Sequence, residues 1–188
     1  MGFILAGGKS SRMGVDKAFL DFGGSTLLVR ALAVVGAACP SVVIVGDRRE
    51  FAAYGTVIQD IYGGCGPLGG IHAALRSSAA ELNLALAVDM PFVSPALLAF
   101  LFAAANDADA IVTVPRTARG FQPLCAVYRR AFADTAEVAL RAGNYKIDAL
   151  FAGVSLRVVD EKELAAEGLS EQLFVNVNTP EDLRAAKQ

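Results

Sequence analysis

The sequence predicts an α/β protein, a three-layer sandwich in which helices cover both faces of a mostly parallel central sheet. Short apolar segments alternate with segments of helical periodicity along most of the chain, an order typical of strand–helix–strand units. The apolar segments are continuous rather than alternating with polar residues, as expected for strands covered on both faces. The length of 188 residues suits one domain, and no linker or repeat divides it, so residues 1–188 are predicted to form a single domain.

Five short segments in the first two thirds of the chain are predicted to be buried strands. Each is rich in Val, Ile, Leu or Ala and is followed by Gly, Gln, Asp or Pro. They are Gly2–Ala6, Val42–Val45, Thr56–Ile58, Leu84–Val88 and Ala110–Val114. After Pro115 the alternation changes, and the predicted order is Leu124–Tyr128, a helix at Ala131–Ala142, a short segment Lys146–Phe151, a strand at Ser155–Val159 and a last helix from Thr179.

Three segments between the first strands have apolar residues at helical spacing. They are Thr26–Ala38, Leu68–Ala80 and Pro95–Ala105. The third has the clearest start, because Ser94 suits an N-cap and Pro95 suits the first helical position.

Composition excludes several other classes of protein. Apolar residues make up 54% of the chain and charged residues 19%, which excludes a disordered chain and a coiled coil. The net charge of −2 gives no reason to expect binding to nucleic acid. The longest apolar run, Ala96–Ala105, is about half of the roughly 20 residues that a membrane span needs. We therefore expect a cytoplasmic protein that binds neither nucleic acid nor membrane.

The cysteines suggest neither a disulfide framework nor a zinc site. Cys39, Cys65 and Cys125 are widely separated and form no C-x-x-C pair. His72 is the single histidine, and a nucleophilic pair with Cys65 is a minor alternative to ordinary packing roles for both residues.

Polar residues follow the predicted strands. In an open parallel sheet, ligands bind beyond the carboxyl ends of the strands. Each of these exits carries a glycine, a charged residue or a proline; they are Gly7–Lys17, Gly46–Arg48, Gln59–Asp60, Asp89–Pro91 and Pro115–Arg116.

The first exit is suited to an anion. Gly7 and Gly8 allow the backbone to approach a ligand closely, and Lys9, Arg12 and Lys17 supply three cations for a polyphosphate. Neither the P-loop nor the dinucleotide-binding pattern is present. A solvated surface turn is the alternative interpretation of these residues taken alone.

Taken as a whole, residues 5–17 form a longer motif. Their sequence, L-A-G-G-K-S-S-R-M-G-V-D-K, resembles the signature of nucleotidyltransferases with a Rossmann-like α/β fold. The Gly-Gly form is most similar to the molybdenum cofactor guanylyltransferases. The resemblance continues in order along the chain, at Gly66–Gly70, Asp89–Phe92, Gln122–Leu124 and Asn176–Asp182.

This resemblance implies a nucleotide site made of residues after the first, third and fourth strands. Main-chain atoms of Leu5, Ala6, Gly7 and Gly8 would line it. Arg12 and Lys17 would hold the triphosphate, Asp60 would contact the nucleotide, and Asp89 would bind Mg²⁺ together with the phosphates. In the family pattern, an Asn near the end of the second strand contacts the nucleotide. This chain has Asp47 in that region instead, and Asp47 is expected to replace that contact. Ser25 also stands where Lys or Arg is common.

Asp89 can also be argued from the residues alone. It ends an apolar strand, and a carboxylate near an apolar core is costly unless a positive group pairs with it. Magnesium held by one carboxylate plus substrate phosphates would supply that charge; capping of the helix at Ser94, or of its turn, is the alternative. Asn176 and Asn178 are candidates for a second metal ligand, with helix capping as the alternative.

The function implied by the resemblance is transfer of GMP from GTP to the molybdopterin form of the molybdenum cofactor, with Mg²⁺ as cofactor and Arg12, Lys17 and Asp89 as the catalytic residues. Molybdoenzymes or other cofactor-biosynthesis proteins are the partners that it suggests. A cytidylyltransferase for the same cofactor and a sugar-phosphate nucleotidyltransferase are alternative enzymes. A nucleotide-binding protein or cofactor chaperone without turnover is the alternative outside the enzymes.

Overall fold

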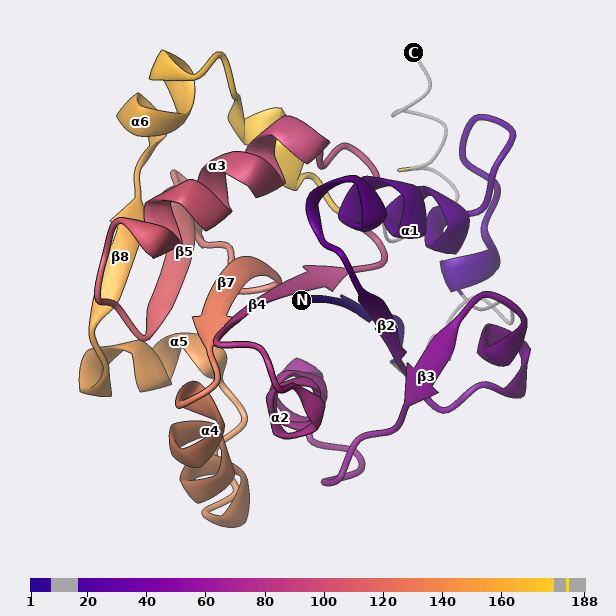
Figure 1. The fold of residues 1–188 in the computed structure, drawn as a ribbon, viewed down its shortest axis with the longest axis horizontal. Coiled ribbons are helices and arrows are strands. Elements are labelled where there is room, and N and C mark those ends of the chain that lie inside the picture. Colours follow the sequence, from indigo (N-terminus) through magenta and orange to yellow (C-terminus); the bar gives the residue numbers. More distant parts are fainter. Residues whose placement is uncertain (8–16, 178–181, 183–188) are drawn as a thin grey trace.

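A central sheet with helices on both faces makes up the computed structural model of the chain, which describes residues 1–7, 17–177 and 182 (Figure 1). The strands lie in the order β3-β2-β1-β4-β7-β5-β6, and β8 pairs with β5. The predicted three-layer α/β class is confirmed. The strands are β1 (Gly2–Leu5), β2 (Val42–Val45), β3 (Thr56–Ile58), β4 (Leu82–Ala87), β5 (Val112–Thr117), β6 (Gly120–Phe121), β7 (Cys125–Arg129) and β8 (Leu156–Val159).

The helices divide between the two faces of the sheet. Figure 1 shows α1, α3 and α6 on one side and α2, α4 and α5 on the other. Their bounds are α1 (Leu27–Ala38), α2 (Pro67–Ser77), α3 (Pro95–Asn106), α4 (Phe132–Arg141), α5 (Ile147–Leu150) and α6 (Glu161–Ala166), and the 3-10 helices are η1 (Lys17–Phe19), η2 (Arg49–Ala53), η3 (Phe151–Gly153) and η4 (Glu171–Phe174). No helix in these parts of the chain is both long and apolar enough to cross a membrane.

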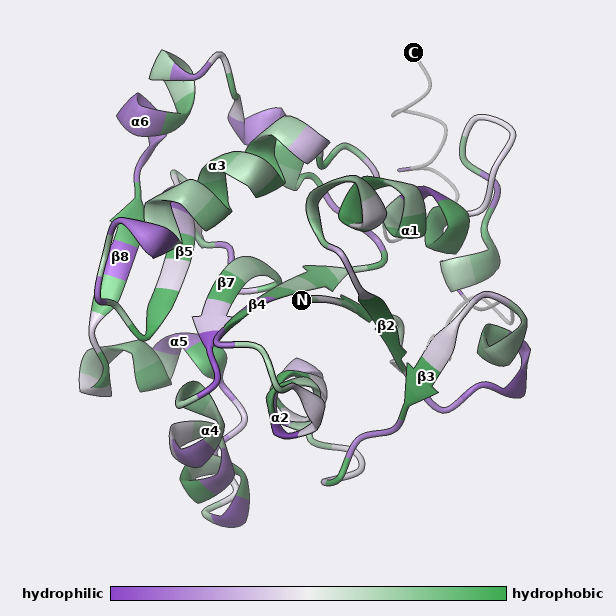
Figure 2. Cartoon of the chain, viewed as in Figure 1, coloured by the Kyte–Doolittle hydropathy of each residue, from purple (hydrophilic) through white to green (hydrophobic). Residues whose placement is uncertain are grey.

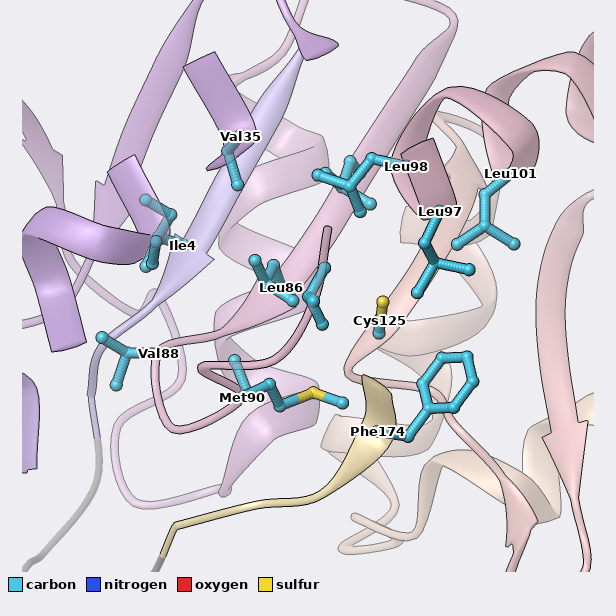
Figure 3. Close-up of a cluster of buried hydrophobic side chains, with 14 of the residues drawn as sticks. Ile4, Val35, Leu86, Val88, Met90, Leu97, Leu98, Leu101, Cys125 and Phe174 are labelled. Atoms are coloured by element: carbon cyan, nitrogen blue, oxygen red, sulfur yellow. The ribbon is translucent and has the colours of Figure 1, made fainter. Parts of the chain in front are cut away.

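Two hydrophobic cores result from this arrangement, because successive residues of a strand point to opposite faces of the sheet. Ile4 and Leu86 belong to the core under α1 and α3, which Figure 3 shows together with Leu97 and Leu98 of α3. Phe3 and its neighbours on the other face belong to the core against α2 and α4. Figure 2 shows β2 and β4 as largely hydrophobic, whereas α4 carries hydrophilic residues. Burial on both faces explains why the strand segments are continuously apolar.

Strand β7 breaks the parallel pattern in the middle of the sheet. It is antiparallel to both β4 and β5, so the residues that precede it lie at the carboxyl end of β4. The N–H of Ala87 donates to the carbonyl of Leu124 at 2.8 Å. The turn before β7 therefore lies beside the residues that follow β4.

The helix starts follow the predicted chemistry. Thr26 caps α1 through the N–H of Val29, and Ser94 caps α3 through the N–H of Leu97. The predicted end of α2 at Ala80 is wrong, because Ser78 is extended and its hydroxyl oxygen accepts the N–H of Ala80. Such a local side-chain bond competes with helix continuation.

Two elements were not predicted. Residues Gly120–Phe121 form β6, which makes a hairpin with β5 and carries that strand on to Thr117. Helix α6 begins at a capping box, in which Asp160 accepts the N–H of Glu163 while the Glu163 carboxylate accepts the N–H of Asp160. The predicted last helix, from Thr179, lies outside the described residues apart from Asp182.

Candidate active site

A cavity of about 210 Å³ lies at the carboxyl ends of β1, β2 and β4. This is the edge at which ligands bind in open α/β sheets. Its lining residues are Leu5, Ala6, Gly7, Lys17, Val45, Asp60, Gly66, Pro67, Gly70, Ala87, Val88, Asp89 and Leu124. A second cavity, between α1 and the loop after β4, has no room for a water molecule. The first cavity is therefore the candidate site.

Six of the residues expected to bind nucleotide meet in this cavity: Leu5, Ala6, Gly7, Lys17, Asp60 and Asp89. Asp47 does not line it. Gly8, Arg12 and Asn178 lie outside the described residues.

Asp89 and Lys17 form an ion pair at one end of the cavity. The Lys17 Nζ lies 3.5 Å from Asp89 Oδ2, and the Asp89 side chain is 17% exposed. Burial raises the pKa of Asp89 above its ordinary value, and the nearby ammonium of Lys17 opposes that rise. Ser94 caps α3, so capping of that helix does not account for Asp89.

The other carboxylate oxygen of Asp89 favours a bound cation. Asp89 Oδ1 is buried and has no hydrogen-bond partner in the described parts of the chain. A buried acceptor without a donor is costly, and a cation would satisfy it. No group of three or more His, Cys, Asp or Glu that could hold a metal occurs within residues 1–7, 17–177 and 182. Mg²⁺ is often held by one or two carboxylates and substrate phosphates, and the buried Oδ1 of Asp89 would fit that arrangement.

The C-terminal part of the described chain contacts the backbone of Asp89. The N–H of Val177 donates to the main-chain carbonyl of Asp89 at 2.8 Å. Asn178, the candidate second ligand, is the next residue in the sequence, and its position is not described.

Asp60 lies against the first turns of α2. A Cβ on Gly69 would lie 3.3 Å from Asp60 Oδ2 and 2.9 Å from the carbonyl oxygen of Tyr62, and a Cβ on Gly70 would lie 3.5 Å from Asp60 Oδ1. The two glycines therefore let the carboxylate approach the helix backbone. Partial burial raises the pKa of Asp60, and the charge of Asp47 raises it further. Asp60 is thus an acceptor held in the cavity, with Asp47 as its neighbour.

The backbone N–H groups after β1 are already bonded. Those of Ala6 and Gly7 both donate to the carbonyl of Val45, at 2.9 and 3.1 Å. The Gly7 N–H is therefore bonded within the protein, although the glycines of this exit were expected to bring the backbone close to an anionic ligand. The pair of bonds ties the start of the glycine loop to β2 instead.

The segment after Asp89 is fixed to α1. The Nε of Arg30 donates to the carbonyl of Pro91, and the guanidinium lies 5.2 Å from the ring centre of Phe22. Phe22 in turn packs edge-on against Phe92 with ring centres 5.5 Å apart. These contacts hold the loop that carries Asp89.

Several lining residues were not predicted as site residues. Val45, Val88 and Leu124 are apolar and look like ordinary core residues in the sequence. Leu124 reaches the cavity because β7 is antiparallel to β4, and the pattern of single residues does not contain that information.

Comparison with known proteins agrees with this geometry. Residues 2–160 match the family described as the MobA-like NTP transferase domain. A probable molybdenum cofactor guanylyltransferase from Pelotomaculum thermopropionicum is 38% identical, covering 99% of this chain and 91% of the relative. A molybdenum cofactor guanylyltransferase from Desulfosudis oleivorans is 34% identical, covering 99% and 93%.

A solved structure has the same fold over nearly the whole chain. It is the molybdopterin-guanine dinucleotide biosynthesis protein A from Archaeoglobus fulgidus, with a TM-score of 0.84 and 29% identity over 98% of this chain and 95% of that one. The resemblance inferred from the sequence motifs is confirmed, and the chain belongs to the family of MobA-like NTP transferase domains.

Proposed function

We propose that this chain transfers GMP from GTP to the molybdopterin form of the molybdenum cofactor and releases pyrophosphate. One observation carries the proposal: the same cavity is lined by the Lys17–Asp89 ion pair and by the Asp60 carboxylate. A nucleotide presents the matching groups, since its phosphates are anionic and its guanine carries N–H donors. Relatives of nearly the same length carry the name of this activity.

The chemistry needs no general base. The attacking group is a phosphate monoester, whose second pKa of about 6 leaves it largely ionised at neutral pH. Its oxygen forms a bond to the α-phosphorus of GTP while the bond from that phosphorus to the bridging oxygen of pyrophosphate breaks. Catalysis of such a transfer consists mainly of positioning and charge stabilisation.

The residues of the cavity suit this task. Lys17 supplies a cation beside the phosphates, and Asp89 holds Lys17 at 3.5 Å. Asp89 would hold Mg²⁺ together with the phosphates, and the ion would supply positive charge against the charge that develops on the leaving pyrophosphate. We propose Gly8 and Arg12 as further contacts of the triphosphate, and Asn178 as a second metal ligand, on the sequence motif alone.

The preference of the protein among nucleoside triphosphates tests the proposed function. Guanine presents the N1–H and N2–H donors side by side, which the Asp60 carboxylate can accept together, and neither adenine nor cytosine presents that pair. We expect kcat/KM for GTP to exceed that for ATP or CTP by at least about tenfold, or roughly 1.4 kcal/mol of transition-state binding. The measurement is transfer to molybdopterin with each triphosphate at subsaturating concentration. A preference for CTP would favour the cytidylyltransferase alternative, and GTP binding without pyrophosphate release would favour the non-catalytic one.

Arg30 provides a test of how Asp89 is positioned. Replacement by Ala removes a hydrogen bond from a charged donor to Pro91 and a contact with the Phe22 ring. We expect a loss of about 1–3 kcal/mol in the free energy of unfolding and a several-fold fall in kcat with little change in the KM for GTP. Chemical denaturation and steady-state kinetics measure the two effects.

Arg129 is the matched control for Arg30. It also donates to main-chain carbonyls, those of Ala110 and Ala108, but it lies at the opposite edge of the sheet. Arg129→Ala should lower stability comparably and leave kcat unchanged. An equal fall in kcat for both variants would show that Arg30 contributes only general stability.

A further inference from the structure

The proposed function leaves one direction open for the acceptor. In that proposal the base lies over β1, β2 and the start of α2, where Asp60 and Gly70 line the cavity, and the reacting phosphate lies at Asp89 after β4. The next strands along the sheet are β7 and then β5. Leu124, which precedes β7, lines the cavity on that side. The acceptor must therefore extend from Asp89 across β7 toward β5.

A fixed, exposed arginine lies in that direction. Arg116 is exposed at the carboxyl end of β5, and its guanidinium lies 5.9 Å from the ring centre of Phe121. Phe121 packs edge-on against Phe151 with ring centres 5.2 Å apart. No ion pair of Arg116 occurs among residues 1–7, 17–177 and 182. The face of the guanidinium is thus supported, while its charge and its N–H groups remain available.

The hairpin that carries Arg116 is held by its own hydrogen bonds. The N–H of Gln122 donates to the carbonyl of Pro115 at 2.8 Å, and the Gln122 side-chain amide donates to Thr117 Oγ1 at 3.2 Å. The N–H of Ala118 donates to the carboxylate of Glu161, so the nearby acidic group is engaged with the backbone. The hairpin is therefore a supported element rather than a loose loop.

The distance between Asp89 and β5 suits an acceptor that contains a fused ring. Neighbouring strands lie about 4.8 Å apart, so two strand spacings separate Asp89 from β5 by roughly 10 Å. The acceptor of the proposed reaction carries its phosphate at one end and a planar pterin at the other. The pterin presents a ring carbonyl oxygen, whose two lone pairs can accept both parallel N–H groups of an arginine fork. A lysine lacks the planar fork that makes such a double contact.

We propose that Arg116 binds the pterin end of the acceptor, with its guanidinium resting on Phe121 and its N–H groups directed at the carbonyl oxygen of the ring edge. This inference rests on the proposed function, because it takes the acceptor from it. It assigns a second-substrate site to the β5–β6 hairpin, separate from the nucleotide cavity.

The test measures acceptor binding with and without transfer. Arg116→Met removes the charge and keeps an apolar contact with Phe121. We expect it to raise the KM for molybdopterin, and the Kd measured from pterin fluorescence without GTP, by about tenfold or more, while the KM for GTP changes less than about twofold. Arg116→Lys should recover little of the loss, since it restores charge without the fork.

Arg119→Ala is the matched control, because it removes the same charge from the same hairpin. It should change the Kd for molybdopterin by less than about twofold. Unchanged acceptor binding by Arg116→Met, full recovery by Arg116→Lys, or an equal loss in Arg119→Ala would overturn the inference. If the wild-type chain binds molybdopterin through Arg116 but transfers no nucleotide, the proposed function fails and the binding site stands.

Discussion

Replacement of Asp89 by Asn is expected to lower kcat for nucleotide transfer by about 10²–10³ or more, the scale on which loss of a charge-stabilising group acts. The variant keeps the shape of the side chain but loses the charge that pairs with Lys17 and that the buried Oδ1 would offer to a cation. The measurement is kcat at saturating GTP and Mg²⁺. Asp109→Asn is the control, because Asp109 is fully exposed at the far edge of the sheet and its loss should leave kcat unchanged.

The same variant should remain folded. Burial raises the pKa of Asp89, so the ionised form is less favourable in the folded chain than in the unfolded one. For a carboxyl group with a raised pKa, the folded chain loses stability as the pH rises through that pKa. Asp89→Asn should therefore be at least as stable as the wild type at pH 7, and the difference should shrink below pH 4. A variant that unfolds would mean that the carboxylate is structural, and unchanged turnover would remove Asp89 from the site.

Lys17→Ala is the second substitution with a large expected effect. It removes a cation from the phosphate end of the cavity, and a hydrogen bond to a charged group contributes about 1.5–3 kcal/mol. We expect kcat/KM for GTP to fall by about 10- to 100-fold, with Lys17→Arg recovering part of it. Steady-state kinetics at varied GTP measures this.

The control for Lys17 is Lys162→Ala. Lys162 is exposed on α6, away from the cavity, and its loss changes the net charge by the same amount. Equal effects of the two substitutions would show that kcat/KM for GTP depends only on the net charge of the protein.

The layered fold could be predicted from the sequence because burial on both faces imposes a visible pattern. The strands Val42–Val45 and Thr56–Ile58 appear with the predicted bounds. Strand β6 could not be predicted, since two residues are too short for periodicity to register. Helix α6 did carry a signal, the Asp160 and Glu163 capping box, which the analysis of apolar periodicity does not detect.

The residues of the candidate site could be predicted where a polar side chain lies beyond the end of a strand. Lys17, Asp60 and Asp89 are polar residues beyond strand ends, and the structure brings them to one cavity. Leu124 belongs to a segment that carries the family resemblance, but its place in the cavity could not be predicted, because the direction of β7 depends on long-range pairing with β4. The bonds that Ala6 and Gly7 make to Val45 likewise depend on which strand lies beside β1.

The proposed reaction moves GMP, and no other part of GTP, to molybdopterin. To test this, the purified chain is incubated with Mg²⁺, molybdopterin and GTP labelled at either the α- or the γ-phosphate. We expect the α label in the acceptor product and the γ label in pyrophosphate, in equal amounts, and we expect Asp89→Asn to abolish both signals. Transfer of the γ label to the acceptor, or pyrophosphate release with CTP but not with GTP, would contradict it.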